Sequence, residues 1–221
     1  MKSFKLLLLL LAAGLLLQCK KEEAAPKDCA ARWKIIKYTG DEAKVENGHL
    51  FMSTNRNDAF PVQSYQRGVT GDFEISVDFN NLTNPDLLSQ SITSILINDT
   101  INGGFFAEAS ATSNTVFTQC LLQGKADYKY GLLTQVKNGK FKISRTGNSM
   151  TVEASSPAIS ETAKITINVP STVTGLQIGV MLGASTNKDN QRNSVEFDNF
   201  SITNGGGKVK SDQFDCNTVI P

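Results

Sequence analysis

The stretch FEISVDFN at residues 73–80 decides the fold class, because apolar and polar side chains alternate strictly along it. Phe73 and every second residue after it are apolar, whereas the residues between them carry a carboxylate, a hydroxyl or an amide. A period of two indicates a β-strand with one buried face and one wetter face. Gly71 and Asp72 precede the stretch and have turn chemistry. The chain therefore contains an amphipathic strand of an antiparallel sheet.

The same alternation recurs along most of the chain. Further strands are predicted at 92–97, 104–111, 115–122, 141–145, 149–153, 164–169, 176–182 and 195–202. A glycine–asparagine pair at 147–148 lies between two of them and predicts a tight hairpin. In the last strand the apolar positions change phase between Phe197 and Phe200, which predicts a bulge near 198–199. Roughly nine or ten strands joined by polar turns predict an all-β fold, a two-sheet antiparallel β-sandwich.

The first two dozen residues resemble the leader of a bacterial lipoprotein. A basic start precedes an apolar run at 6–17, which Cys19 and a group of charged residues then close. The run is shorter than the ~20 residues that a membrane-spanning helix needs, and it matches the apolar region of a signal peptide. Leu16 and Cys19 have the spacing of a lipobox, in which the cysteine becomes the lipidated N-terminus. Gln18 departs from that motif, and an ordinary signal peptide with an incidental Cys19 is the alternative.

This organisation predicts a lipid-anchored protein of the outer membrane. The expected parts are a signal peptide at 1–18, a tether at 19–28 with the lipid on Cys19, a β-sandwich domain at 29–216 and a tail at 217–221. Each buried methylene of an acyl chain contributes ~0.8 kcal/mol, so the lipid holds the protein at the membrane without a spanning helix. The segment KKEE at 20–23 resembles a signal for surface exposure, and a solvated charged linker explains it equally well.

The composition does not indicate that the protein binds nucleic acid. The 22 basic residues nearly balance the 21 acidic ones, and the net charge is +1. No basic stripe interleaved with aromatic residues is present either. Among the four cysteines, Cys120 lies in an apolar strand and is expected to be a small buried residue, and the single histidine, His49, is distant from it in sequence. A nucleophilic Cys–His pair therefore has little support.

Three segments together resemble concanavalin A-like lectin/glucanase domains. They are RGVTGDFE at 67–74, the hairpin at 141–152 and SVEFDNFSI at 194–202, and the resemblance extends over 32–204. It implies a jelly-roll sandwich with a concave sheet, found in sugar-binding lectins, adhesion modules and glycoside hydrolases, so the fold alone does not decide the function.

The resemblance also implies that the two chain ends meet. Export permits disulfides, and Cys29 and Cys216 lie near the two ends of the expected domain, so a Cys29–Cys216 disulfide is predicted. Pairing of Cys120 with either of them is the open alternative.

Sugar binding requires aromatic rings with polar partners. Tyr128 and Tyr130 lie two residues apart on an extended piece, which places both rings on one face. Tyr65 and the polar residues Asn187 and Asp189 are further candidates for lining the same cleft. An ordinary amphipathic strand edge explains Tyr128 and Tyr130 as well.

A catalytic site receives weaker support. Laminarinase-type hydrolases of this fold carry three acids on one strand, and two of them work ~5 Å apart. Glu196 and Asp198 match the first pair, but the third acid is missing, so they are weak candidates and no catalytic residue is assigned. Nor is a metal site assigned: calcium is the one cofactor considered, with its oxygen-donor candidates at Asp78, Asp99, Asp189 and Asp198.

The sequence thus favours a cell-envelope lipoprotein that binds a glycan, or a host or matrix protein ligand, without catalysis. An atypical glycoside hydrolase and a structural envelope lipoprotein with no small ligand are the alternatives.

Overall fold

The computed structural model describes residues 34–36, 40–54, 62–69, 71–83, 92–99, 105–112, 114–122, 125–131, 135–169, 178–185, 192–204, 209–212 and 218–219. For β1, β4, β13, β15 and β16 it describes the backbone only. Within these ranges the backbone forms strands and turns, and no residue is helical. The same ranges contain no apolar helix of membrane-spanning length.

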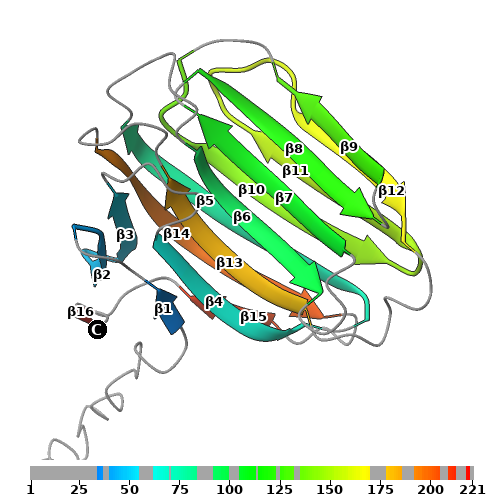
Figure 1. Ribbon diagram of the computed structural model, residues 1–221, viewed down its shortest axis with the longest axis horizontal. Helices are drawn as coiled ribbons and strands as arrows, with labels where there is room; N and C mark the ends of the chain where they lie inside the picture. Colours follow the sequence, from blue (N-terminus) through cyan, green and yellow to red (C-terminus); the bar gives the residue numbers. More distant parts are fainter. Residues whose placement is uncertain are drawn as a thin grey trace, which may run out of the picture.

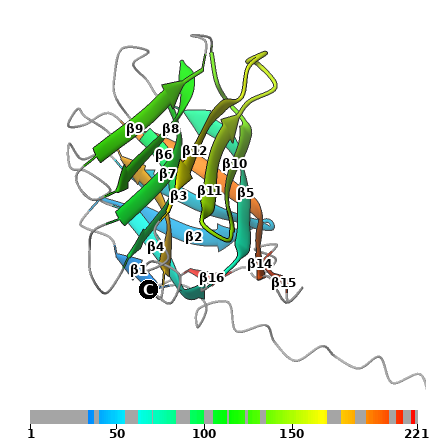
Figure 2. The same ribbon diagram turned by 90° about the vertical axis from the view of Figure 1, so that its right-hand side faces the viewer.

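Two antiparallel sheets pack face to face as two layers (Figure 1, Figure 2). The seven-stranded sheet consists, in spatial order, of β1 (Lys34–Ile36), β4 (Val62–Val69), β13 (Ile178–Ser185), β6 (Ile92–Asp99), β7 (Phe105–Thr112), β8 (Thr115–Leu122) and β9 (Lys125–Tyr130). The nine-stranded sheet has the order β12 (Ala163–Asn168), β11 (Ser149–Ser155), β10 (Gly139–Thr146), β5 (Phe73–Thr83), β14 (Asn193–Asn204), β3 (His49–Thr54), β2 (Glu42–Glu46) and β16 (Thr218–Val219), with β15 (Val209–Asp212) beside β14. The predicted fold class, an all-β two-sheet antiparallel sandwich, is confirmed.

Strand β5 lies at the centre of the nine-stranded sheet, between β10 and β14. The apolar residues of the alternating stretch, from Phe73 to Phe79, are buried, whereas Glu74 is exposed and Asp78 is partly exposed on the other face. Hydrogen bonding continues to Thr83, three residues beyond the predicted end. Alternation in the sequence therefore identified both the strand and its buried face.

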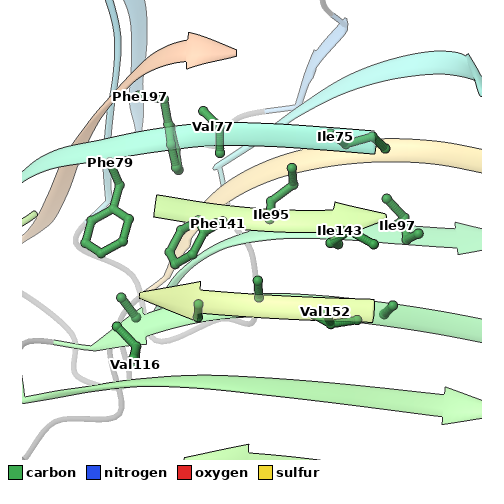
Figure 3. Packing of buried hydrophobic residues seen from close by; sticks show 14 of the residues in the cluster. Ile75, Val77, Phe79, Ile95, Ile97, Val116, Phe141, Ile143, Val152 and Phe197 are labelled. Carbon is green, nitrogen blue, oxygen red and sulfur yellow. The ribbon is translucent and has the colours of Figure 1, made fainter. Parts of the chain in front are cut away.

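The core fills the space between the two sheets (Figure 3). Phe79, Phe141 and Phe197 from the nine-stranded sheet and Ile95 and Ile97 from the seven-stranded sheet are all 0% exposed. Full burial of one such side chain contributes ~1.5–3 kcal/mol, so this cluster supplies the main driving force for folding. Each sheet therefore gives one face to this core and turns its other face outward.

The hairpin turn at 147–148 and the bulge near 198–199 are both present in the structure. Thr146 pairs with Ser149, which leaves a two-residue hairpin loop in which Gly147 has φ 56°. In β14 the register shifts between Asp198 and Ser201, and Asn199 within the shift has φ 50°. The tight hairpin and the bulge are thus confirmed.

The count of nine or ten strands is wrong, since the described residues form sixteen. A hairpin of β2 and β3 was missed, although its loop is Asn47-Gly48, with φ 50° and 80°. This pair is the strongest sequence signal for a type I′ turn. Two other missed strands, β15 and β16, contain four and two residues, too few to show a period, whereas β4 was missed although it has eight residues.

Several predictions fall on residues outside the described ranges. These include the lipidation of Cys19 and the Cys29–Cys216 disulfide, both of which remain predictions. Cys120 lies within the described ranges and is a free, buried thiol, which removes the alternative that it pairs with another cysteine.

Candidate functional site

One transverse row of residues crosses the whole seven-stranded sheet. Pairing of neighbouring strands places, in order, Lys34, Tyr65, Met181, Leu96, Glu108, Gln119 and Tyr128 directly opposite one another. Directly opposed residues share one face of a sheet. The residues that alternate with Glu108 along β7, Ala107 and Ala109, are in the core. The row therefore lies on the outer face of the sheet, away from the core.

Aromatic rings border this outer face at β9, the strand at one edge of the sheet (Figure 1). Tyr128 and Tyr130 are 63% and 59% exposed, and they are the exposed large hydrophobic residues of the described chain. Their ring centroids lie 5.9 Å apart at 67°, and the Tyr130 ring also contacts the buried Phe117, 5.6 Å away. Packing of Tyr130 against Phe117 holds part of this aromatic surface in place.

A buried carboxylate lies two strands from the tyrosines. Glu108 is 1% exposed, and its Oε2 accepts a hydrogen bond from Nε2 of Gln119. Its other oxygen, Oε1, has no hydrogen-bond partner, and neither does the hydroxyl of Ser110 on the same face. An unsatisfied buried acceptor costs ~1–3 kcal/mol. A buried polar atom without a partner indicates either a functional role or a hydrogen-bond partner that is not among the described residues.

Three of the five predicted ligand-binding residues lie within the described ranges, all on the seven-stranded sheet. Tyr128 and Tyr130 both lie on the outer face, paired with Gln119 and Phe117. Tyr65 stands in the same row as Tyr128, at the opposite side of the sheet. The residues between them were missed by the sequence reasoning, although Glu108 in the segment AEASA is a charged residue between small core residues. Asn187 and Asp189 lie outside the described residues.

The weak catalytic pair, Glu196 and Asp198, lies on the other sheet. Glu196 Oε2 accepts a hydrogen bond of 2.7 Å from Nδ2 of Asn81. The third acidic position of the hydrolase pattern is occupied by Ser201, whose hydroxyl lies 3.0 Å from that of Ser76. The outer face of the nine-stranded sheet therefore holds two carboxylates on β14 and a pair of hydroxyls at the third position.

Two of the calcium candidates do meet, because Asp78 and Asp198 are register partners on β5 and β14. Like charges directly opposite each other are unfavourable. Lys140 offsets the charge of Asp78 at 3.2 Å, and Nδ2 of Asn199 donates to the same carboxylate at 2.8 Å. His49 Nδ1 lies 3.6 Å from Asp198 Oδ2.

Metal-ligand geometry is not found at these aspartates. Asp99 ends β6 in the other sheet, and Asp189 is outside the described ranges. Among the residues that the structure describes, no group of three or more His, Cys, Asp or Glu side chains could hold a metal ion.

A shallow polar hollow of ~440 Å³ adjoins Asp78 on this face. It is lined by residues of β5, β10, β11 and the segments next to them, namely Asp78, Asn80, Asn138, Gly139, Lys140, Ser155, Ser156 and Pro157. No aromatic ring lines it, so it lacks the stacking surface present beside Tyr128.

Cys120 and His49 lie in different places. The Cys120 side chain belongs to the core, 2% exposed, whereas His49 borders Asp198 on the outer face of the nine-stranded sheet. Burial, together with the charge of Asp127, raises the pKa of the Cys120 thiol to about 12. A thiol in this state is a poor nucleophile, because the thiolate is the reactive form.

Comparison with known proteins gives matches by structure but none by sequence. No protein family and no curated protein matches the chain. A Saccharomyces cerevisiae protein of unknown function superposes with a TM-score of 0.56 at 13% identity, covering 79% of this chain and 97% of that one. A family 7 alginate lyase superposes with a TM-score of 0.56 at 12% identity, covering 78% and 95% of the two chains.

The alginate lyase from Klebsiella pneumoniae is also similar, with a TM-score of 0.53 at 10% identity and coverage of 76% and 86%. At these identities the likeness concerns the fold alone. It establishes that the chain shares its two-sheet β-sandwich with jelly-roll proteins, the fold type to which the concanavalin A-like domains are related.

Proposed function

We propose that this protein binds a glycan on the outer face of its seven-stranded sheet, at the β9 edge, without catalysis, while a lipid on Cys19 holds it at the outer membrane. The observation that carries the proposal is the exposed pair Tyr128 and Tyr130, placed beside the Glu108–Gln119 pair on one face.

The chemistry of this face suits a carbohydrate. Tyrosine offers an apolar ring face and a polar hydroxyl, so it contacts both the C–H and the O–H groups of a sugar. Gln119 is partly exposed and provides amide hydrogen-bonding groups next to the rings. Binding sites typically combine such an apolar surface with a few well-placed polar groups that fix orientation.

Two further observations support a glycan over other ligands. Several solved structures of similar fold are alginate lyases, which are enzymes named for a polysaccharide. In addition, the partly exposed Gln119 lies directly opposite Tyr128, so an amide adjoins the exposed rings.

Anchoring at the outer membrane rests on the leader. The apolar run at 6–17 ends at Cys19 with lipobox spacing, and acylation there would tether the sandwich through residues 20–28. Mass spectrometry of the mature N-terminus tests this part of the proposal. An acylated Cys19 is expected, and an unmodified N-terminus would refute the anchor.

Glycan-array binding of the purified protein tests the ligand-binding part. Replacing both Tyr128 and Tyr130 by alanine is expected to weaken binding at least tenfold, because the exposed stacking surface is lost. Phe51→Ala is the matched control: it removes a partly exposed ring from β3 in the other sheet and should leave affinity unchanged. Absence of binding to any glycan, or equal binding by the double variant, would refute the proposal.

The same preparation separates the remaining alternatives. Release of reducing sugar that disappears in Glu196→Gln would indicate a glycoside hydrolase. Binding to a matrix protein but to no glycan would assign the tyrosines to a protein interface. A protein that binds neither would fit a structural envelope role.

A further inference from the structure

We infer that this protein forms a symmetric dimer in which β9 pairs antiparallel with β9 of a second copy. The inference goes beyond the proposed function and does not depend on it. It begins from the position of β9, which ends the seven-stranded sheet and, among the described strands, pairs with β8 alone (Figure 1). The side chains at 126–130 are all exposed. A strand in this position has an edge at which another strand can pair with it.

The hydrogen bonds between β8 and β9 show which backbone groups face this edge. The N–H of Gly131, directly after β9, donates to the carbonyl oxygen of Val116 on β8 at 2.8 Å. In an antiparallel pair, residues that bond to the neighbouring strand alternate with residues whose N–H and C=O groups point the other way. Because the pairing of β8 with β9 is continuous, the backbone groups of Ala126, Tyr128 and Tyr130 point away from β8. These residues offer both donors and acceptors to a second strand.

One two-fold register pairs all three of these residues within β9. It places Tyr128 opposite Tyr128 of the second copy, on the symmetry axis, and Ala126 opposite Tyr130 of the second copy. Each such pair exchanges two backbone hydrogen bonds. If the axis moves to residue 127 or to residue 129, one of the three residues has no partner within β9. Backbone hydrogen bonding therefore favours the register centred on Tyr128.

The same register brings opposite charges together. Asp127 and Lys129 are both exposed, and Asp127 of each copy lies opposite Lys129 of the other. Opposite charges directly across a pair of strands are favourable, whereas like charges are unfavourable. An axis at residue 127 would oppose two aspartates, and an axis at residue 129 would oppose two lysines. Charged side chains on an edge strand usually discourage pairing, but here they match a second copy of the same strand.

The dimer joins two seven-stranded sheets into one continuous sheet. Both copies contribute the same surface, which is the arrangement of the commonest protein dimers. Directly opposed residues share one face of a sheet, so Tyr128 and Tyr130 of both copies lie together on the outer face. Aromatic pairs across two strands add to the stability of the pairing.

Disulfide trapping in cells tests the register. The full chain is expressed in two forms that carry different tags, one with Asp127→Cys and the other with Lys129→Cys. Positions 127 and 129 of the two copies form a pair without backbone hydrogen bonds, in which Cα atoms lie ~4.5 Å apart, within the range for a disulfide. Mild oxidation should therefore link the two forms through these cysteines.

Each form expressed alone is the matched control for this experiment. The new cysteine then lies opposite an aspartate or a lysine, so at least fivefold less linked dimer is expected. Equal amounts of dimer from one form and from both would overturn the inference, as would the absence of a link between positions 127 and 129.

Exchange of the two charges tests how the copies recognise each other. Tyr128→Cys, on the symmetry axis, reports the dimer through a single disulfide. In this background Asp127→Lys or Lys129→Asp opposes like charges and should lower the yield of linked dimer at least fivefold. The two exchanges together restore opposite charges and should restore the yield. A yield that neither single exchange lowers, or that the double exchange does not restore, would overturn the inference.

Discussion

The ring of Phe79 occupies the space that a side chain on Gly139 would need. The two residues are register partners on β5 and β10, and a Cβ built on Gly139 would lie 2.6 Å from Cζ of Phe79. Phe79 in turn stacks on Phe141, with centroids 4.5 Å apart. The first residue of β10 is therefore glycine because a core aromatic ring lies across it.

Gly139→Ala is expected to destabilise the protein by about 1–3 kcal/mol, the range for overpacked sites. The added methyl group would meet both the Phe79 ring and the carbonyl of Ser155, and a backbone atom cannot rotate away. Urea unfolding measures the effect. Lys137→Ala, at an exposed position two residues earlier, should stay within about 0.5 kcal/mol of wild type. Equal stability of Gly139→Ala and wild type would mean that the ring moves freely.

Gly147→Ala tests whether the backbone conformation, and not the available space, requires glycine at this position. No atom lies within 4 Å of a Cβ built there, but φ is 56°, a conformation that costs an L-residue ~1–2 kcal/mol. The variant is expected to lose this much stability. The hairpin should still form, because the backbone N–H of residue 147 donates to Asp72 Oδ1 at 2.7 Å and the substitution keeps this donor. Gly147→Asn should recover part of the loss, because asparagine tolerates positive φ. No difference between the alanine and asparagine variants would contradict the backbone explanation.

Asn199 holds the bulge of β14 with φ 50°. Asn199→Val should cost at least ~1 kcal/mol, since a β-branched residue is a genuine outlier at positive φ. Asn199→Gly should cost less, because only the hydrogen bond from Asn199 to Asp78 is lost there. Thermal unfolding of the two variants side by side is the measurement. The reverse order of stabilities would show that the side-chain contact, and not the backbone, sets the requirement for asparagine.

The buried thiol of Cys120 makes the free energy of unfolding depend on pH in the alkaline range. Its thiol has a pKa of about 12 in the folded protein, against 9.0 for an ordinary thiol, so the unfolded chain loses this proton first as the pH rises. The contribution of Cys120 is fully present below pH 9 and is lost between pH 9 and 12, with a limiting slope of ~1.4 kcal/mol per pH unit.

Unfolding free energies of wild type and Cys120→Ala, measured from pH 8 upward, test this dependence. The alanine variant is expected to be less stable at pH 8, because it removes a buried side chain, yet to lose less stability as the pH rises. Parallel curves for the two proteins would contradict a raised pKa at Cys120. Labelling of the native thiol, followed on the peptide that contains Cys120, should also be slow at pH 8.

The sequence by itself determined the local structure of most strands. Alternation along 73–80 identifies both a strand and its buried face, because side chains of a strand point alternately to its two sides. Turn chemistry at 147–148 and the phase change near Asn199 likewise act within a few residues. These features are readable because their causes are local.

The candidate site was decided by the tertiary structure. The sequence identified Tyr128 and Tyr130 as two rings on one face. It did not identify Glu108 and Gln119, because their position beside the tyrosines depends on how β7, β8 and β9 pair. A shift of one residue in that pairing would turn Glu108 toward the core. Conversely, Glu196 and Asp198 matched part of a catalytic pattern along the chain, in which Ser201 occupies the position of a third acid, and pairing of β14 with β5 placed the Ser76 hydroxyl beside that of Ser201. Period-two alternation fixes which residues share a face of one strand, whereas the register between strands, set by the packing of the whole sandwich, fixes which residues meet.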